Sequence, residues 1–134
     1  MKHDEFIGQV QHRAALSSRG EAEVATRAVL ETLGERLSGN EPAHAAAQLP
    51  LGIDAYINHS GSGVGEPFSL EEFFQRVSQR ANIDISDAMH RSEVVIGVLQ
   101  EAVNKEEVED IRSQLPKDFR FSLFRAKSDA ENVS

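Results

Sequence analysis

Hydrophobic residues recur at helical spacing along most of the chain. Phe6, Val10 and Ala14 are four residues apart, and a longer apolar stripe runs from Ala22 to Leu37. Positions three or four residues apart lie on one face of an α-helix, whereas a half-buried strand alternates apolar and polar residues. Such alternation is absent from the sequence. The pattern therefore predicts an all-α protein whose helices each bury one face.

The apolar pattern occurs twice. Shifting the sequence by 67 residues places Phe6 on Phe73, Val10 on Val77, Arg13 on Arg80, Ala14 on Ala81 and Leu16 on Ile83. A shift of 66 then places Ala22 on Ala88, Thr26 on Ser92, Val29 on Val95, Leu33 on Leu99 and Leu37 on Val103. The same shift superimposes the Gln-Leu-Pro triplets at 48–50 and 114–116. We interpret this register as a duplicated helical repeat, with Leu33 and Leu99 as equivalent core positions.

Local signals mark where the helices begin and end. A serine or aspartate is followed three residues later by an acid at Ser18–Glu21, Ser69–Glu72 and Asp84–Asp87. The first side chain can accept a hydrogen bond from a free amide of the first turn, and the acid favours the positive end of the helix. A third helix is predicted after Asn40, which can cap it, and over 105–115. The proline of each triplet ends that helix and can open a short fourth one, over 51–57 and 117–124.

These elements predict one domain over 4–124, packed as a single orthogonal or irregular helix bundle. The chain has 134 residues, which is about one domain. The predicted repeats cover 4–57 and 70–124. A linker rich in glycine and serine joins them over 58–69, and 125–134 form a polar tail.

Three motifs resemble a known family. They are Phe-Ser-Leu-Glu-Glu-Phe at 68–73, Ala-Val-Leu-Glu-Thr-Leu at 28–33 and the two Gln-Leu-Pro triplets. Over 4–124 the chain resembles the bacterial family called domain of unknown function 2267. The resemblance implies a small, all-helical bacterial protein built from two similar halves. It implies no activity and no catalytic residues, because the family has none assigned.

Composition narrows the function classes. Hydrophobic residues make up 40% and charged residues 27%, and the chain has no cysteine, which excludes disulfides and thiolate metal sites. No apolar run approaches the length of about eighteen residues needed to cross a membrane. The start, Met1 to Glu5, precedes no apolar stretch, so we expect no signal peptide and a cytoplasmic location.

The balance of charge disfavours nucleic acid as a partner. Twenty-two acids against fourteen bases give a net charge of −8. The cluster of Lys117, Arg120, Arg125 and Lys127 is too small a basic footprint to change that expectation.

Metal and cofactor sites are not predicted. The histidines at 3, 12, 44, 59 and 90 include no pair at the helical ligand spacing of three or four residues. Glu41–His44 and Asp87–His90 have that spacing, but both lie in early helical turns and are interpreted as surface pairs. The acids Glu106, Glu107, Glu109 and Asp110 are expected to fan outward from a solvated helix start.

No catalytic constellation is predicted either, which favours a non-enzymatic protein. The glycines at 61, 63 and 65 lack the buried strand and the lysine of a phosphate-binding loop. His59 and Ser60 lie in the linker, which is a poor place to hold a nucleophile in position.

One stretch of the second half is unusually apolar. The residues from Val94 to Leu99 are hydrophobic on nearly every side of a helix, interrupted by Gly97. Such a helix is either central or covered by a partner, and the glycine suggests close approach of another backbone.

The end of the sequence carries the candidate partner surface. Three of the seven phenylalanines fall in six residues, and the surface comprises Phe119, Arg120, Phe121, Phe124 and Arg125. A short helix cannot direct all of these rings at one core, yet core packing is still favoured over a partner site for this stretch. The leading hypothesis is a protein-interaction or self-association module, as a homodimer or with an unidentified protein. The alternative is a small-molecule binder or enzyme with its site between the repeats.

Overall fold

The computed structural model describes residues 1–59 and 63–125. These residues form eight α-helices and no β-strand, which confirms the all-α prediction. The helices are α1 (His3–Arg13), α2 (Arg19–Arg36), α3 (Glu41–Ala46), α4 (Asp54–Ile57), α5 (Leu70–Ala81), α6 (Ile85–Ala102), α7 (Lys105–Ser113) and α8 (Lys117–Ser122). The predicted fourth helices are both shorter than expected, and 51–53 form a turn before α4.

The capping signals are confirmed with one exception. The side chains of Ser18, Ser69 and Asp84 each accept a hydrogen bond from the amide of the acid three residues later, at 2.8 to 3.1 Å. Asn104 caps α7 in the same way. Asn40 precedes α3, but its side chain makes no capping bond, so that prediction was wrong. Here Pro42 in the first turn removes one of the amides that would need a partner.

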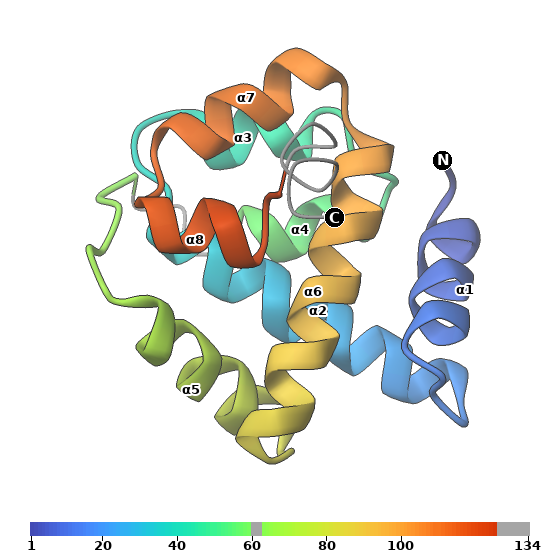
Figure 1. The fold of residues 1–134 in the computed structure, drawn as a ribbon. Coiled ribbons are helices and arrows are strands. Elements are labelled where there is room, and N and C mark those ends of the chain that lie inside the picture. The colour runs from blue at the N-terminus through green and yellow to red at the C-terminus, as the bar shows by residue number, and fades with distance from the viewer. Residues whose placement is uncertain (60–62, 126–134) are drawn as a thin grey trace.

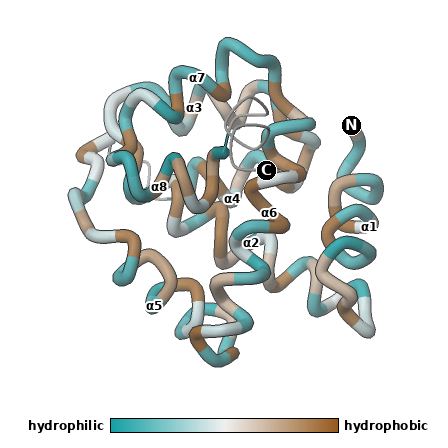
Figure 2. The backbone as a smooth tube through the Cα atoms, in the orientation of Figure 1, coloured by the Kyte–Doolittle hydropathy of each residue, from teal (hydrophilic) through white to brown (hydrophobic). Residues whose placement is uncertain are grey.

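The two long helices, α2 and α6, pack against each other at the centre of the bundle (Figure 1). Helices α1 and α5 each contact both of them, and α3 lies beside α7 at one end of the molecule. Hydrophobic and hydrophilic positions follow one another along the helical turns (Figure 2). The central helix α2 does not bury a single face, however, because all seven residues from 28 to 34 are buried.

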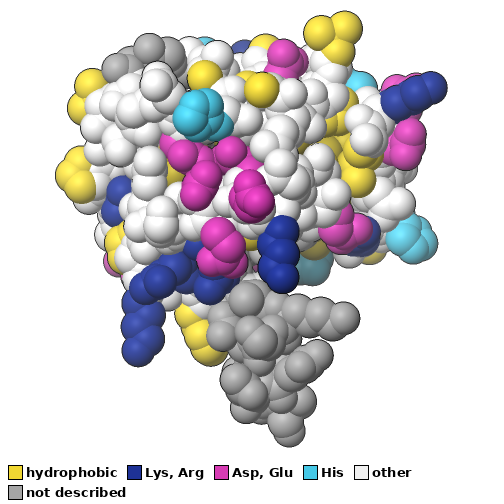
Figure 3. Space-filling view, turned by 90° about the horizontal axis from the view of Figure 1, so that it is seen from above, with side chains coloured by type: hydrophobic (Ala, Val, Ile, Leu, Met, Phe, Trp, Pro, Cys, Tyr) yellow, Lys and Arg dark blue, Asp and Glu magenta, His cyan; other side chains and the backbone are white. Residues whose placement is uncertain are grey.

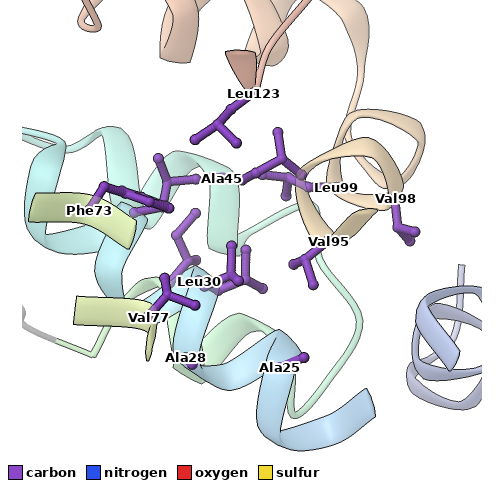
Figure 4. Close-up of a cluster of buried hydrophobic side chains, with 14 of the residues drawn as sticks. Ala25, Ala28, Leu30, Ala45, Phe73, Val77, Val95, Val98, Leu99 and Leu123 are labelled. Carbon is purple, nitrogen blue, oxygen red and sulfur yellow. The ribbon is translucent and has the colours of Figure 1, made fainter. Parts of the chain in front are cut away.

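The core forms where the apolar faces of these helices meet. Leu33 and Leu99 are both fully buried, as predicted. Side chains from α2, α5 and α6, among them Leu30, Phe73 and Leu99, gather in one cluster (Figure 4). Because most of the apolar residues of α6 are buried, this helix is central and needs no partner to cover it.

The glycine prediction was wrong for α6. A Cβ placed on Gly97 would meet nothing within 4 Å, so no other backbone approaches there. The close approach occurs in the first half instead. A Cβ on Gly34 would lie 2.0 Å from the carbonyl oxygen of Ile57, so the absence of a side chain lets α4 pack directly on α2.

The helices of the two halves make reciprocal contacts. Gln114 accepts a hydrogen bond from the Ser38 amide at 2.8 Å, and Gln48 accepts one from the Asn104 amide at 2.7 Å. The shift of 66 relates Gln48 to Gln114 and Ser38 to Asn104. A contact and its exchanged copy are what a twofold arrangement produces. The duplication itself stays a prediction, and these matched bonds support it.

Two ion pairs repeat the reciprocal pattern. Arg13 of α1 forms a bidentate pair with Glu101 of α6, and Arg80 of α5 pairs with Glu35 of α2. The sequence shifts relate the two arginines and the two glutamates. The first helix of each half is thus tied to the long helix of the other half.

Part of the predicted linker is ordered by backbone hydrogen bonds. The amide of Gly39 donates to Gly63 at 2.8 Å, and the amide of Glu66 donates to Glu35 at 2.9 Å. The linker residues Ser60, Gly61 and Ser62, and the tail from 126 onward with Lys127, lie outside the described residues. Among the described helices, none has both the length and the apolar character to cross a membrane.

Candidate functional site

The structure divides the five residues of the predicted partner surface between core and solvent. Phe119 and Phe124 are buried, and the Phe119 ring meets the Phe73 ring edge-on at 5.9 Å. These two residues therefore belong to the core, as the favoured reading of this stretch expected, and they drop out of the candidate partner surface. The cause is that one side of α8 and the turn after it close over the apolar end of α5.

The other three residues remain on the outside of α8. Phe121 is 54% exposed, and Arg120 and Arg125 are exposed beside it. The Arg125 guanidinium lies 4.6 Å from the centre of the Phe121 ring, which is a cation–π distance. Lys117, at the start of α8, helps to line a hollow of about 260 Å³ with Phe121 and Arg120. We call Lys117, Arg120, Phe121 and Arg125 the α8 surface.

Acidic side chains lie close to this basic surface. Glu106, Glu109 and Asp110 are exposed on α7, the helix that precedes α8 along the chain. Figure 3 shows carboxylates gathered on one face of the molecule, with Lys and Arg side chains next to them. Arg112 of α7 lines the same hollow as Phe121 and lies 3.6 Å from the Glu109 carboxylate, so α7 and α8 present both signs of charge beside the aromatic ring.

A second cluster lies between α3 and α7. Glu41 and His44 of α3 meet Glu107 of α7, and one ligand atom from each lies within 4.8 Å of the other two. Glu41 is 8% exposed and Glu107 is 4% exposed, while His44 is exposed. We call these three residues the α3–α7 cluster.

The inward position of Glu107 corrects the expectation of a solvated acidic turn. Its amide donates to the capping side chain of Asn104 at 2.8 Å, which fixes the start of α7. With the start fixed, Glu107 faces α3, whereas its neighbours Glu106 and Glu109 face solvent. Apolar periodicity within each helix did not reveal this cluster. The shift of 66 places Glu41 on Glu107, and these matched glutamates were the signal in the sequence that could have revealed it.

The two carboxylates of the α3–α7 cluster are buried with unsatisfied oxygen atoms. One oxygen of Glu41 and one of Glu107 are buried without a hydrogen-bond partner. Burial, together with a hydrogen bond and charge from Glu41, raises the pKa of Glu107 to about 8. The negative charge of Asp110 acts in the same direction. The site therefore favours neutralisation of Glu107 by a proton or by a cation.

The other histidines do not form comparable clusters. His3 contacts Glu23 at 2.8 Å and the Leu51 carbonyl at 3.1 Å, and the hydrogen bond with Glu23 raises the pKa of His3. Asp87 and His90 are both exposed, as the surface interpretation predicted. Within the described residues, the α3–α7 cluster is the one group of three ligand-type side chains.

A comparison with known protein families finds a match over most of the chain. A family model described as "Uncharacterized conserved protein (DUF2267)" matches residues 3–121. The chain belongs to this family. No curated protein matches it.

Membership confirms the resemblance seen in the sequence motifs. The description of the DUF2267 family names no reaction, ligand or partner. The function of this DUF2267 protein therefore has to be argued from the α8 surface and the α3–α7 cluster themselves.

Proposed function

We propose that this DUF2267 protein is a non-enzymatic protein-interaction module that associates with a second copy of itself through the α8 surface. The observation that carries the proposal is Phe121, which stays 54% exposed although the neighbouring rings of Phe119 and Phe124 are buried. A large aromatic side chain flanked by arginines is the composition of interface centres.

Charge complementarity favours a second copy of the chain as the partner. The α8 surface contributes Lys117, Arg120 and Arg125, and the adjoining helix α7 exposes Glu106 and Glu109. In a twofold dimer, each basic surface can face the acidic helix of the other copy, and the arrangement closes after two chains. Such pairing also explains how a chain with a net charge of −8 can self-associate.

The expected association is weak. Phe121 is already half covered, so its further burial contributes about 1 kcal/mol per copy. Association costs several kilocalories per mole in lost translational and rotational freedom. Aromatic burial and ion pairing are therefore both needed, and raising the salt concentration should weaken the dimer.

Sedimentation velocity across a concentration series tests the aromatic contribution. Phe121→Ser should raise the dimer dissociation constant about thirtyfold, because each dimer loses two buried rings at about 1 kcal/mol each. Leu51→Ser is the matched control, since Leu51 is the most exposed large hydrophobic residue among those that the structure describes and lies outside the α8 surface. A parent chain that stays monomeric at every concentration, or equal effects of the two variants, would contradict the proposal.

A charge exchange tests the twofold arrangement. Arg120→Glu and Glu106→Lys should each weaken self-association, because like charges then face each other at both contacts. A mixture of the two variants should form a heterodimer, since both of its contacts pair opposite charges. If the mixture associates no better than either variant does separately, the α8 surface does not face α7 of a second copy.

The alternative function, a small-molecule site between the halves, has weaker support. A hollow of about 250 Å³ lies where α2 meets α5, lined by Val24, Arg27, Ala28, Glu31 and Arg80. This volume is below the range of about 300–1,000 Å³ that ligand pockets occupy.

We further propose a cytoplasmic location. Disulfides are rare in the reducing cytoplasm, and a chain without cysteine does not depend on them for stability.

A further inference from the structure

The α3–α7 cluster holds two carboxylates at the meeting point of matched helices. The shift of 66 relates Glu41 to Glu107 and also His44 to Asp110. The contacts between the halves are reciprocal, as if an approximate twofold axis related them. A residue close to such an axis lies against its own counterpart from the other half. Glu41 and Glu107 face each other for this reason.

The two buried oxygens are a separate observation that points to a ligand. Glu41 and Glu107 are each more than nine-tenths buried, and each has one oxygen without a hydrogen-bond partner. A buried carboxylate oxygen without a partner is costly, since desolvation is not offset by a new bond. No lysine or arginine of the described residues forms an ion pair with either carboxylate. A bound cation would offset that cost.

We propose that Glu41, His44 and Glu107 bind a divalent transition-metal ion such as Zn²⁺. Two carboxylate oxygens and one imidazole nitrogen make a three-ligand set that leaves a fourth position for water. The imidazole favours Zn²⁺ over Mg²⁺ and Ca²⁺, which prefer oxygen ligands alone. The exposed acid Asp110 follows Glu107 by one helical turn and adds negative charge near the site.

The geometry requires little rearrangement. The three ligand atoms lie within 4.8 Å of one another. Four-coordinate zinc, with bonds of about 2.0–2.2 Å, places its ligands about 3.4 Å apart, so the ligand atoms need to close by at most about 1.4 Å. His44 is exposed and free to change rotamer, and its exposure also gives the ion a path from solvent.

Titration calorimetry of the tag-free 134-residue chain after chelator treatment tests the site. Zn²⁺ should bind in a ratio of one ion per chain, and Mg²⁺ should bind at least about tenfold more weakly. His44→Ala should weaken Zn²⁺ binding by about tenfold or more. His90→Ala is the matched control, because His90 is an exposed helical histidine three residues after an acid, as His44 is. That control should leave binding unchanged.

A second pair of variants tests the buried carboxylate. Glu107→Gln should weaken Zn²⁺ binding as His44→Ala does, whereas Glu106→Gln changes a solvent-exposed neighbour and should not. Phe121→Ser should bind Zn²⁺ as the parent does, so this test is independent of self-association. The proposal is overturned if no saturable binding is seen, or if a control weakens binding as much as its partner variant. Absence of zinc binding together with a higher melting temperature for Glu107→Gln would show that the carboxylates share a proton instead.

Discussion

Two glycines in the central helices have opposite surroundings. A Cβ on Gly34 of α2 would lie 2.0 Å from the Ile57 carbonyl oxygen, whereas a Cβ on Gly97 of α6 would meet nothing within 4 Å. The position matched to Gly34 is Gln100, whose amide donates to the Leu123 carbonyl at 3.4 Å. The same contact between helices is therefore made by direct approach in one half and through a side chain in the other.

This difference predicts opposite results for one substitution. Gly34→Ala should lower the free energy of unfolding by about 1–3 kcal/mol, because α4 must move away from α2. Gly97→Ala should raise it by up to about 1 kcal/mol, since alanine favours the helix and fills open space. Urea denaturation of both variants checks the prediction. Both substitutions gain the same helix propensity, so a difference between them reports the contact with α4. A stabilised Gly34→Ala would show that α2 and α4 are not in direct contact.

At the scale of the element, each long helix is held by side chains that are fully buried in the core. Leu33 of α2 and Leu99 of α6 are fully buried at matched positions, so truncation of either to alanine should cost about 2–5 kcal/mol. Val24→Ala is the control, because Val24 lies on α2 but is exposed. Denaturant melts should show a large loss of stability for both leucine variants and a small one for the valine variant. If both leucine variants were neutral, the buried face of these helices would be wrongly assigned.

The helices could be predicted from the sequence, but the contacts between them could not. Apolar spacing and capping residues act within one helix, so α2, α5 and α6 begin where Ser18, Ser69 and Asp84 predict. Glu107 lies four residues before the buried Ile111 and shares its face of α7, but helical periodicity does not show that α3 packs over that face and brings Glu41 to it. Gly97 was misjudged for the same reason, since a glycine does not show which carbonyl lies near it.

At the scale of the whole molecule, matched bonds join the two halves. The side chains of Gln48 and Gln114 each accept a hydrogen bond from the opposite half. This gives the Gln-Leu-Pro triplets a second structural role: the proline ends one helix and the glutamine anchors the other half. The repeated triplet was visible in the sequence, but its partner amides depend on how the halves pack.

The two ion pairs between the halves differ in burial, which predicts unequal effects. The side chain of Glu35 is 15% exposed and that of Glu101 is 54% exposed. Burial would raise the pKa of Glu35, but hydrogen bonds from Arg80 and Arg76 outweigh it, so this pKa lies below the usual 4.5. Glu35→Gln should therefore cost about 1–3 kcal/mol at pH 7. Glu101→Gln should cost less than about 1 kcal/mol, because solvent screens its pair with Arg13.

The lowered pKa of Glu35 also fixes the direction of the pH dependence. A carboxyl group whose pKa is lower in the folded state contributes full stability above pH 4.5, and that contribution is lost as the pH falls through the folded pKa. The parent should therefore lose more stability than Glu35→Gln when acidified below pH 4.5, so their unfolding free energies should converge. Urea denaturation at several pH values between 3 and 7 measures this, with Glu101→Gln as the control whose difference from the parent stays small. A constant difference between the parent and Glu35→Gln across that range would show that the ionised Glu35 does not hold the two halves together.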